Sequence, residues 1–190
     1  TLVFQDMEIL SIFGYSMIIA LSSTAIALMI GTWAGILLGP TKFRGKLIVF
    51  ALVCLPAVIP GIISAIALRI FAETISLSPG TFAVILSHTI HNVPFVVLVV
   101  MARLNSQPDS HIDAAKDLGA DNLIAFYRVT LPYLKPALIG ASIFCMLISF
   151  DDFVRSFFLG GYEPTLPVYI FSQLRTGMSP MINAVSAVAL

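Results

Sequence analysis

The sequence predicts an all-α integral membrane protein. Of the 190 residues, 58% are hydrophobic and 11% are charged, whereas a soluble domain carries about 25% charged residues. The mean hydropathy is +1.00, and several uncharged runs approach the roughly 20 residues that an α-helix needs to cross a bilayer. Such a chain cannot cover its own surface in water, so we expect it to fold in lipid.

Charge and cysteine content exclude other classes. Ten basic residues balance ten acidic residues, so there is no basic field for nucleic acid. The two cysteines, Cys54 and Cys145, lie inside apolar runs, where a thiol behaves as a small hydrophobic group. The pattern therefore predicts no nucleic-acid partner, no disulfide framework and no metal cluster.

Four apolar runs are candidate membrane spans. They cover residues 13–38, 47–70, 81–101 and 133–150. The second run is interrupted by Pro56 and Pro60, and the third contains Pro94. Proline inside a span is tolerated where neighbouring helices satisfy the freed carbonyl groups, so we expect helices in all four.

The end of the chain differs from the spans. Residues 151–180 are too polar and too rich in glycine and proline to cross a membrane, and we expect an outer loop with a short amphipathic helix at 166–174. A fifth apolar run starts near Met181 and stops at Leu190, which is too short to cross. The chain also starts at Thr1. We therefore expect residues 1–190 to form a single transmembrane domain truncated at both ends.

Loop charges predict the orientation, because basic residues collect in cytoplasmic loops. Two connections, 40–46 and 102–136, hold seven of them: Lys42, Arg44, Lys46, Arg103, Lys116, Arg128 and Lys135. The 71–80 loop and residues 1–11 contain acidic residues and no basic ones. The two basic connections are therefore expected inside and the two acidic segments outside.

Glycines repeat along the first predicted span. Gly31, Gly35 and Gly39 form two overlapping GxxxG units on one helix face, a spacing that lets a second backbone approach closely in lipid. The alternative is that small residues are simply common in membrane helices. The same glycines do not start a phosphate-binding loop, because five residues separate Gly39 from Gly45 and Leu47 follows Lys46 where serine or threonine is required.

Polar residues lie in the middle of the third predicted span. His88 and His91 stand three residues apart, followed by Asn92. A polar group at that depth must face protein or water, and we expect interhelical hydrogen bonds. The spacing lacks the HExxH pattern of metalloproteases. An intramembrane hydrolase that uses Ser142 as nucleophile is the alternative, although Ser142 lacks the usual turn motif.

The connection between the third and fourth spans carries helix signals. Ser110 and Asp113 have the spacing of a capping box, and Gly119 supplies a left-handed stop. Asp121 is expected to cap a second short helix that ends before Leu131. The first helix places apolar or small residues on one side, and several apolar residues would lie in water if the connection were a plain loop. A docking partner is therefore expected.

The same connection resembles a family signature. Asp113, Ala114 and Ala115, then Gly119, then Val129 to Pro132 closely resemble the EAA motif of ABC importer membrane subunits, with aspartate for glutamate at the start and valine for isoleucine at 129. Further segments extend the resemblance to the spermidine/putrescine permease branch of type I importers: LPAVIPG, HTIHNVPFVVLVVMARL, FDDFVRSFFLGG, LPVYIFSQLRTG and SPMINA.

The resemblance implies a bacterial inner-membrane subunit with six helices in the full protein, of which about five are represented here. Its partners would be a second permease subunit, two ATPases and an external substrate-binding protein. ATP and magnesium would bind to the ATPases, so this chain would hold no cofactor, no metal and no catalytic residue. The coupling region would be 109–132, with the ATPase contacted by Asp113, Ala114, Ala115, Gly119, Ala120, Leu131 and Pro132.

An acidic pair follows the fourth span. Asp151 and Asp152 are flanked by Phe150 and Phe153, and carboxylates beside aromatic rings suit an ammonium group of a polyamine. The alternative is that aromatic residues gather at membrane interfaces anyway and that Arg155 neutralises one aspartate. Other open functions are import of a different solute or ion by the same fold, and an ion-coupled transporter that needs no ATPase.

Overall fold

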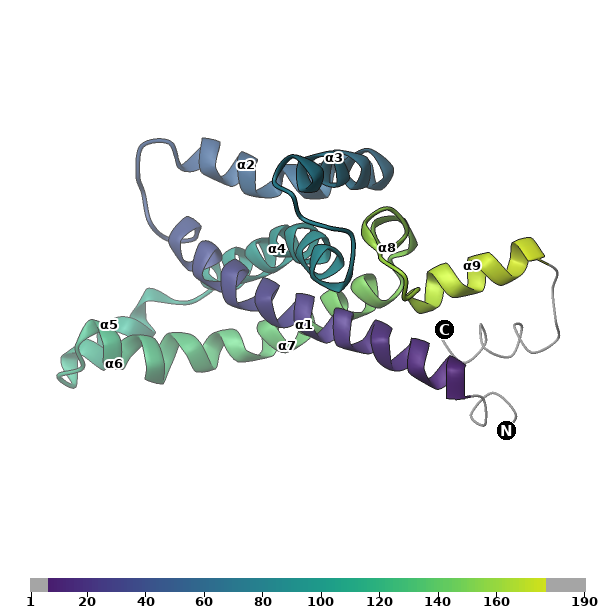
Figure 1. The fold of residues 1–190 in the computed structure, drawn as a ribbon. Helices are drawn as coiled ribbons and strands as arrows, with labels where there is room; N and C mark the ends of the chain where they lie inside the picture. The colour runs from purple at the N-terminus through teal and green to yellow at the C-terminus, as the bar shows by residue number, and fades with distance from the viewer. Residues whose placement is uncertain (1–6, 177–190) are drawn as a thin grey trace. The chain divides into compact units, whose positions relative to one another are not determined.

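The computed structural model describes residues 7–176, without the side chain of Asp109, and throughout this part of the chain every regular element is a helix (Figure 1). In chain order the elements are α1 (Met7–Leu38), α2 (Lys46–Val58), α3 (Gly61–Thr74), α4 (Thr81–Asn105), α5 (Asp109–Asp117), α6 (Asn122–Ala125), the π-helical turn η2 (Phe126–Thr130), α7 (Leu131–Phe150), α8 (Phe153–Leu159) and α9 (Leu166–Thr176).

Three helical segments are long and apolar enough to cross a membrane: α1, α4 and the continuous run from Asn122 to Phe150. The pair α2 and α3 counts as a fourth span if it is taken together. The first, third and fourth predicted spans are thereby confirmed as helices. The second is not one straight helix, because Pro60 lies between α2 and α3 with an extended backbone, while Pro56 is accommodated inside α2.

The segment after α7, as far as residue 176, contains two helices, where one was expected. The predicted helix at 166–174 is present as α9, and α8 precedes it. The sequence analysis missed α8 because it treated residues 153–159 as part of the glycine- and proline-rich segment that follows the fourth span. The apolar run from Met181 lies outside the described residues.

The chain divides into two compact units. In its described part, the first contains residues 7–24, 59–89 and 146–176. One cluster of buried residues here is Ile19, Ala83, Val84 and Leu159, and another is Ile9, Ile12 and Leu166. Helix α8 packs against α3 within this unit (Figure 1). The backbone of Gly80 donates to the carbonyl of Leu159 at 2.9 Å, so the 75–80 loop is tied to the end of α8.

The second unit comprises Ala25–Val58 and Ile90–Cys145. Its core is built from Ala27, Val96, Val100, Leu134 and Cys145. The glycines of α1 lie on α4 here. A Cβ added at Gly31 would lie 2.6 Å from the Cβ of Val96, and one at Gly35 would lie 2.7 Å from the Cβ of Val100. Both distances are shorter than non-bonded contacts between carbon atoms. The GxxxG face therefore lets α1 and α4 approach more closely than alanine would allow.

Candidate functional site

Helix α5 starts earlier than the sequence pattern predicted. Its N-cap is Pro108, with ψ of 131°, and no side chain caps the helix. Ser110 is therefore already helical, and a capping box needs its serine in the non-helical position before the first turn. The capping box at Ser110 and Asp113 was wrong.

The end of α5 is built as predicted. Gly119 has φ of +85°, its N–H donates to the carbonyl of Lys116 at 2.8 Å, and the N–H of Ala120 donates to the carbonyl of Ala115 at 3.0 Å. These two bonds are the Schellman termination, which requires a left-handed residue that only glycine adopts readily. The left-handed stop is confirmed, and it gives α5 a fixed end.

The second helix of the connection begins as predicted but does not end before Leu131. The Oδ1 atom of Asp121 accepts a hydrogen bond from the N–H of Ile124 at 2.7 Å, which confirms the N-cap. The helix then continues through η2 into α7, and the N–H of Leu131 bonds to the carbonyl of Phe126. Pro132 has no N–H for the carbonyl four residues earlier and would clash with it. A widened π turn before the proline accommodates this, so the predicted end before Leu131 was wrong.

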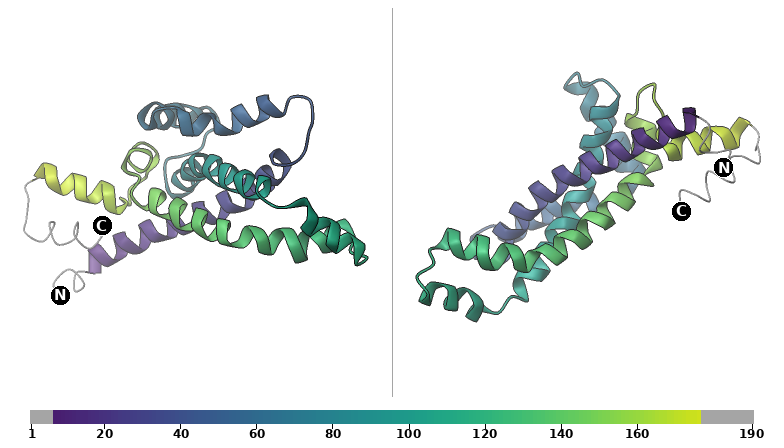
Figure 2. Two further views of the ribbon diagram at one scale, coloured as in Figure 1. Left: turned by 180° about the vertical axis from the view of Figure 1, so that it is seen from behind. Right: turned by 90° about the horizontal axis from the view of Figure 1, so that it is seen from below.

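The predicted coupling region, residues 109–132, exposes an apolar surface. Helix α5 packs on α6 and η2, and Figure 2 shows α5 beside the start of the α6–α7 run. Asp113 and Ala114 are exposed, and Ala115 is half-buried. Leu118 is 91% exposed and Leu123 is 68% exposed. Neither leucine is covered by the residues that the structure describes, so this surface remains available for a partner.

The two aspartates at the end of α7 have different environments. Asp152 is the N-cap of α8: its Oδ1 accepts the N–H of Arg155 at 3.0 Å, and its Oδ2 pairs with the Arg155 guanidinium. Asp151 is exposed. The acidic pair therefore presents one carboxylate to the surroundings, because the other is occupied by Arg155.

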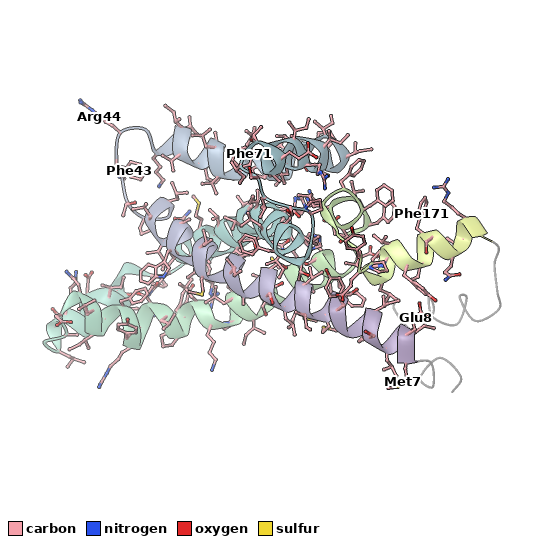
Figure 3. The ribbon with its side chains drawn as sticks, viewed as in Figure 1. Met7, Glu8, Phe43, Arg44, Phe71 and Phe171 are labelled. Carbon is pink, nitrogen blue, oxygen red and sulfur yellow. The ribbon has the colours of Figure 1, made fainter. Side chains whose placement is uncertain are left out.

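The rings around the aspartates are also divided. Phe150 lies edge-on to Phe13 with ring centroids 5.4 Å apart. Phe153 stacks on Phe157 at 5.4 Å and lies 4.8 Å from Phe171 of α9, which Figure 3 labels. Phe150 is thus part of the helix packing, while Phe153 belongs to an aromatic cluster formed by α8 and α9.

A chain of hydrogen bonds through His88 joins four helices. His88 is 1% exposed, its Nδ1 lies 2.7 Å from the Oγ of Ser149, and its Nε2 lies 3.3 Å from the Oγ of Ser156. Ser149 in turn lies 2.9 Å from the Oγ of Ser23. The chain of polar groups thus runs from α1 through α7 and α4 to α8. The sequence indicated a hydrogen-bonded His88 but not these serines, because single serines are common in membrane helices.

The other polar residues that the sequence singled out in the spans, His91, Asn92 and Ser142, belong to the second unit. His91 is half-buried and lies edge-on to Phe95 at 5.5 Å. The side chain of Asn92 donates to the carbonyl of Cys145 at 3.3 Å, as expected for an interhelical bond. The hydroxyl of Ser142 donates to the carbonyl of Ile139 in its own helix at 2.7 Å. Within residues 7–176, no three His, Cys, Asp or Glu side chains are placed to hold a metal ion.

These observations define a class: an all-helical, multi-pass membrane protein with a capped helix hairpin between two spans. The chain belongs to the family of binding-protein-dependent transport system inner membrane components, whose model matches residues 31–190. It is therefore an inner-membrane permease subunit of an ABC importer and is not itself the ATPase. Membership in this family argues against the intramembrane hydrolase.

Similar proteins agree with this assignment. The chain is 32% identical to the spermidine/putrescine transport system permease protein PotC of Haemophilus influenzae, over 93% of this chain and 69% of that protein. It is 31% identical to the putrescine transport system permease protein PotI of Escherichia coli, over 98% and 69%. A chain in the inward-facing MetNI methionine ABC transporter has the same fold, with a TM-score of 0.79, 22% identity and coverage of 92% and 84%.

Proposed function

We propose that this subunit imports a polyamine, putrescine or spermidine, by alternating access in a complex with a second permease subunit, two ATPases and an external binding protein. The observation that supports a polyamine as substrate is the sequence identity of about 31% to two polyamine permeases along nearly the whole chain. The same fold occurs in a methionine transporter, so import of another small solute or ion is the second candidate.

The proposed coupling element is α5 with its Gly119 stop. A helix that transmits force needs a fixed end, and the two Schellman bonds provide it. It also needs a surface that a partner can cover, and Leu118 supplies exposed apolar area at the end of that helix. By this proposal the ATPase covers Leu118 together with Asp113 and Ala114, and ATP-driven closure moves α5 and the helices joined to it.

One pair of variants tests the docking. Leu118→Asp places a charge at the proposed contact, and Tyr162→Asp places the same charge at a fully exposed position in the outer segment. Both side chains are solvent-exposed, so neither change disturbs packing. The ATPase is expected to be lost from the purified complex with Leu118→Asp and retained with Tyr162→Asp. Full retention in both variants would show that the ATPase does not dock on α5.

The proposed cargo contact is the exposed Asp151. Its carboxylate attracts an ammonium group and is not paired with Arg155, which is bound to Asp152. Asp151→Asn is expected to raise the KM for putrescine about tenfold, which corresponds to about 1.4 kcal/mol. Glu163→Gln, in another exposed part of the outer segment, is the matched control and is expected to leave KM unchanged. Equal KM values for Asp151→Asn and wild type would remove Asp151 from the substrate path.

A further inference from the structure

The connection between α1 and α2 and the start of α2 line an open cavity of about 570 Å³. This volume falls within the range of about 300–1,000 Å³ that is typical of ligand sites. Its walls are largely apolar and come from the loop, the start of α2 and one residue of α4: Phe43, Leu47, Ile48, Phe50 and Met101, with Lys46 at the edge. All of these residues belong to the second unit.

The loop has a fixed shape. Gly45 has φ of +88°, which turns the chain into α2. The Nζ atom of Lys46 donates to the carbonyls of Gly39 at 2.6 Å and Thr41 at 3.0 Å, the first of which lies just beyond the end of α1. The cavity is therefore formed by a turn that is held to the preceding helix.

Two cations, Lys42 and Arg44, stand in the chain on either side of the cavity residue Phe43, and neither forms an ion pair with a described residue. Lys42 and Arg44 are exposed, and Figure 3 shows Arg44 extending away from the ribbon. Among residues 7–176 the ion pairs are Arg69 with Glu73 and Arg155 with Asp152, and neither is in this loop. Positive charge without a counter-ion next to an apolar cavity is complementary to an amphiphile with an anionic head.

The position in the membrane identifies the amphiphile. Basic loops lie on the cytoplasmic side, where the leaflet carries anionic lipids and where basic pockets next to helices hold their head groups. Leu47 and Ile48 are mostly exposed at the start of α2, which is also where the second predicted span begins, so the cavity lies at the expected cytoplasmic end of that span.

We propose that this loop and the first turn of α2 bind an anionic phospholipid, with its phosphate held by Lys42 and Arg44 and one acyl chain in the cavity. A soluble phosphate would use the cations but not the apolar walls. A helix of a partner subunit would use the apolar walls but would leave the two cations without counter-ions.

The test measures lipid retention by the full-length importer complex with native mass spectrometry, after titration with dioleoyl-phosphatidylglycerol or dioleoyl-phosphatidylcholine. Saturable binding of phosphatidylglycerol and much weaker binding of phosphatidylcholine are expected. Lys42→Gln with Arg44→Gln is expected to weaken phosphatidylglycerol binding about thirtyfold, since each basic side chain near an anionic surface contributes about fivefold. Equal binding of the two lipids by the wild type would overturn the proposal.

Two further variants separate a site from general attraction. Lys135→Gln removes an exposed cation near the start of α7, outside the proposed ATPase contact, and is expected to leave binding unchanged; a loss equal to that of Lys42→Gln alone would mean diffuse attraction and would overturn the site. Ile48→Asn makes the cavity wall polar without changing charge. It is expected to weaken binding, and undiminished binding would show that no acyl chain enters the cavity.

A soluble phosphate and a partner subunit are the two alternative occupants of this site, and each predicts a different result. Glycerol 3-phosphate at millimolar concentration is expected not to displace the phospholipid; displacement would assign the cations to a soluble phosphate. If the isolated permease retained phosphatidylglycerol and the assembled complex did not, a partner subunit would cover the cavity, and the proposal would be wrong.

Discussion

Asp152 and Arg155 form an ion pair in which both side chains are almost fully buried, at 7% and 6% exposed. The same aspartate caps α8 through the N–H of Arg155. The pair therefore fixes the start of α8, and it leaves Asp151 as the exposed carboxylate of the acidic pair.

Breaking this pair on one side is expected to destabilise the protein strongly. Arg155→Leu leaves Asp152 buried without a counter-ion, a change that costs about 3–5 kcal/mol. The double variant Asp152→Asn with Arg155→Leu removes both charges and is expected to regain most of that loss. Thermal unfolding of the full-length subunit in detergent measures both. A double variant no more stable than Arg155→Leu would mean that the ion pair is not the source of the effect.

The close contact between α1 and α4 gives a second prediction. Gly31→Ala pushes a methyl group into Val96 and is expected to destabilise the protein by about 1–3 kcal/mol. Gly14→Ala in the same helix meets nothing within 4 Å and is expected to be neutral or stabilising by up to about 1 kcal/mol. Melting temperatures of the two variants compare them directly, and equal values would show that the backbones do not approach at Gly31.

The sequence predicted the helical class and three of the spans because their apolar runs are long enough to cross a membrane. It could not predict how local caps compete. Arg155 stands at helical spacing from both aspartates. It pairs with Asp152 because α8 starts at Phe153, which makes Asp152 the N-cap. Similarly, Ser110 matched a capping box, but Pro108 starts the helix earlier. Both differences arise from where a helix begins, which periodicity defines only to within a few residues.

Partners in a membrane core are equally hard to predict from the sequence. His88 was expected to be hydrogen-bonded from its depth in a span, yet Ser149 and Ser156 are far away in sequence. The predicted end of the helix that starts after Asp121 was wrong. Pro132 normally stops a helix, whereas here a π turn just before it lets the helix continue. Such tertiary and backbone adjustments leave no local pattern.

The polar chain through His88 is expected to contribute to stability. His88→Leu keeps most of the side-chain volume but removes a hydrogen-bond partner from the hydroxyls of Ser156 and of Ser149, which keeps its bond to Ser23, and a buried polar group that loses its bond costs about 1–3 kcal/mol. The half-buried His91 is the control position, and His91→Leu is expected to cost less. Chemical unfolding of both variants tests the order, and a larger loss at His91 would contradict it.

The Gly119 stop is expected to matter for coupling more than for folding of the spans. Gly119→Ala puts a side chain at φ of +85°, which costs about 1–2 kcal/mol locally, although nothing lies within 4 Å of the new Cβ. Gly140→Ala in α7 also meets nothing within 4 Å and has no positive φ. Transport-coupled ATPase activity is expected to fall with Gly119→Ala and to stay normal with Gly140→Ala. Unchanged activity in both would show that coupling does not depend on the end of α5.

The most direct test of the account is uptake of radiolabelled putrescine by proteoliposomes that contain the full-length subunit with its ATPase, its partner permease and its binding protein. The account predicts saturable uptake that requires ATP, persists when an uncoupler removes the proton gradient, and disappears with Leu118→Asp. Uptake that continued without ATP, or that was unaffected by Leu118→Asp, would contradict ATP-driven import coupled through α5. Absence of putrescine and spermidine uptake by a complex whose ATPase still responds to its binding protein would contradict the polyamine cargo.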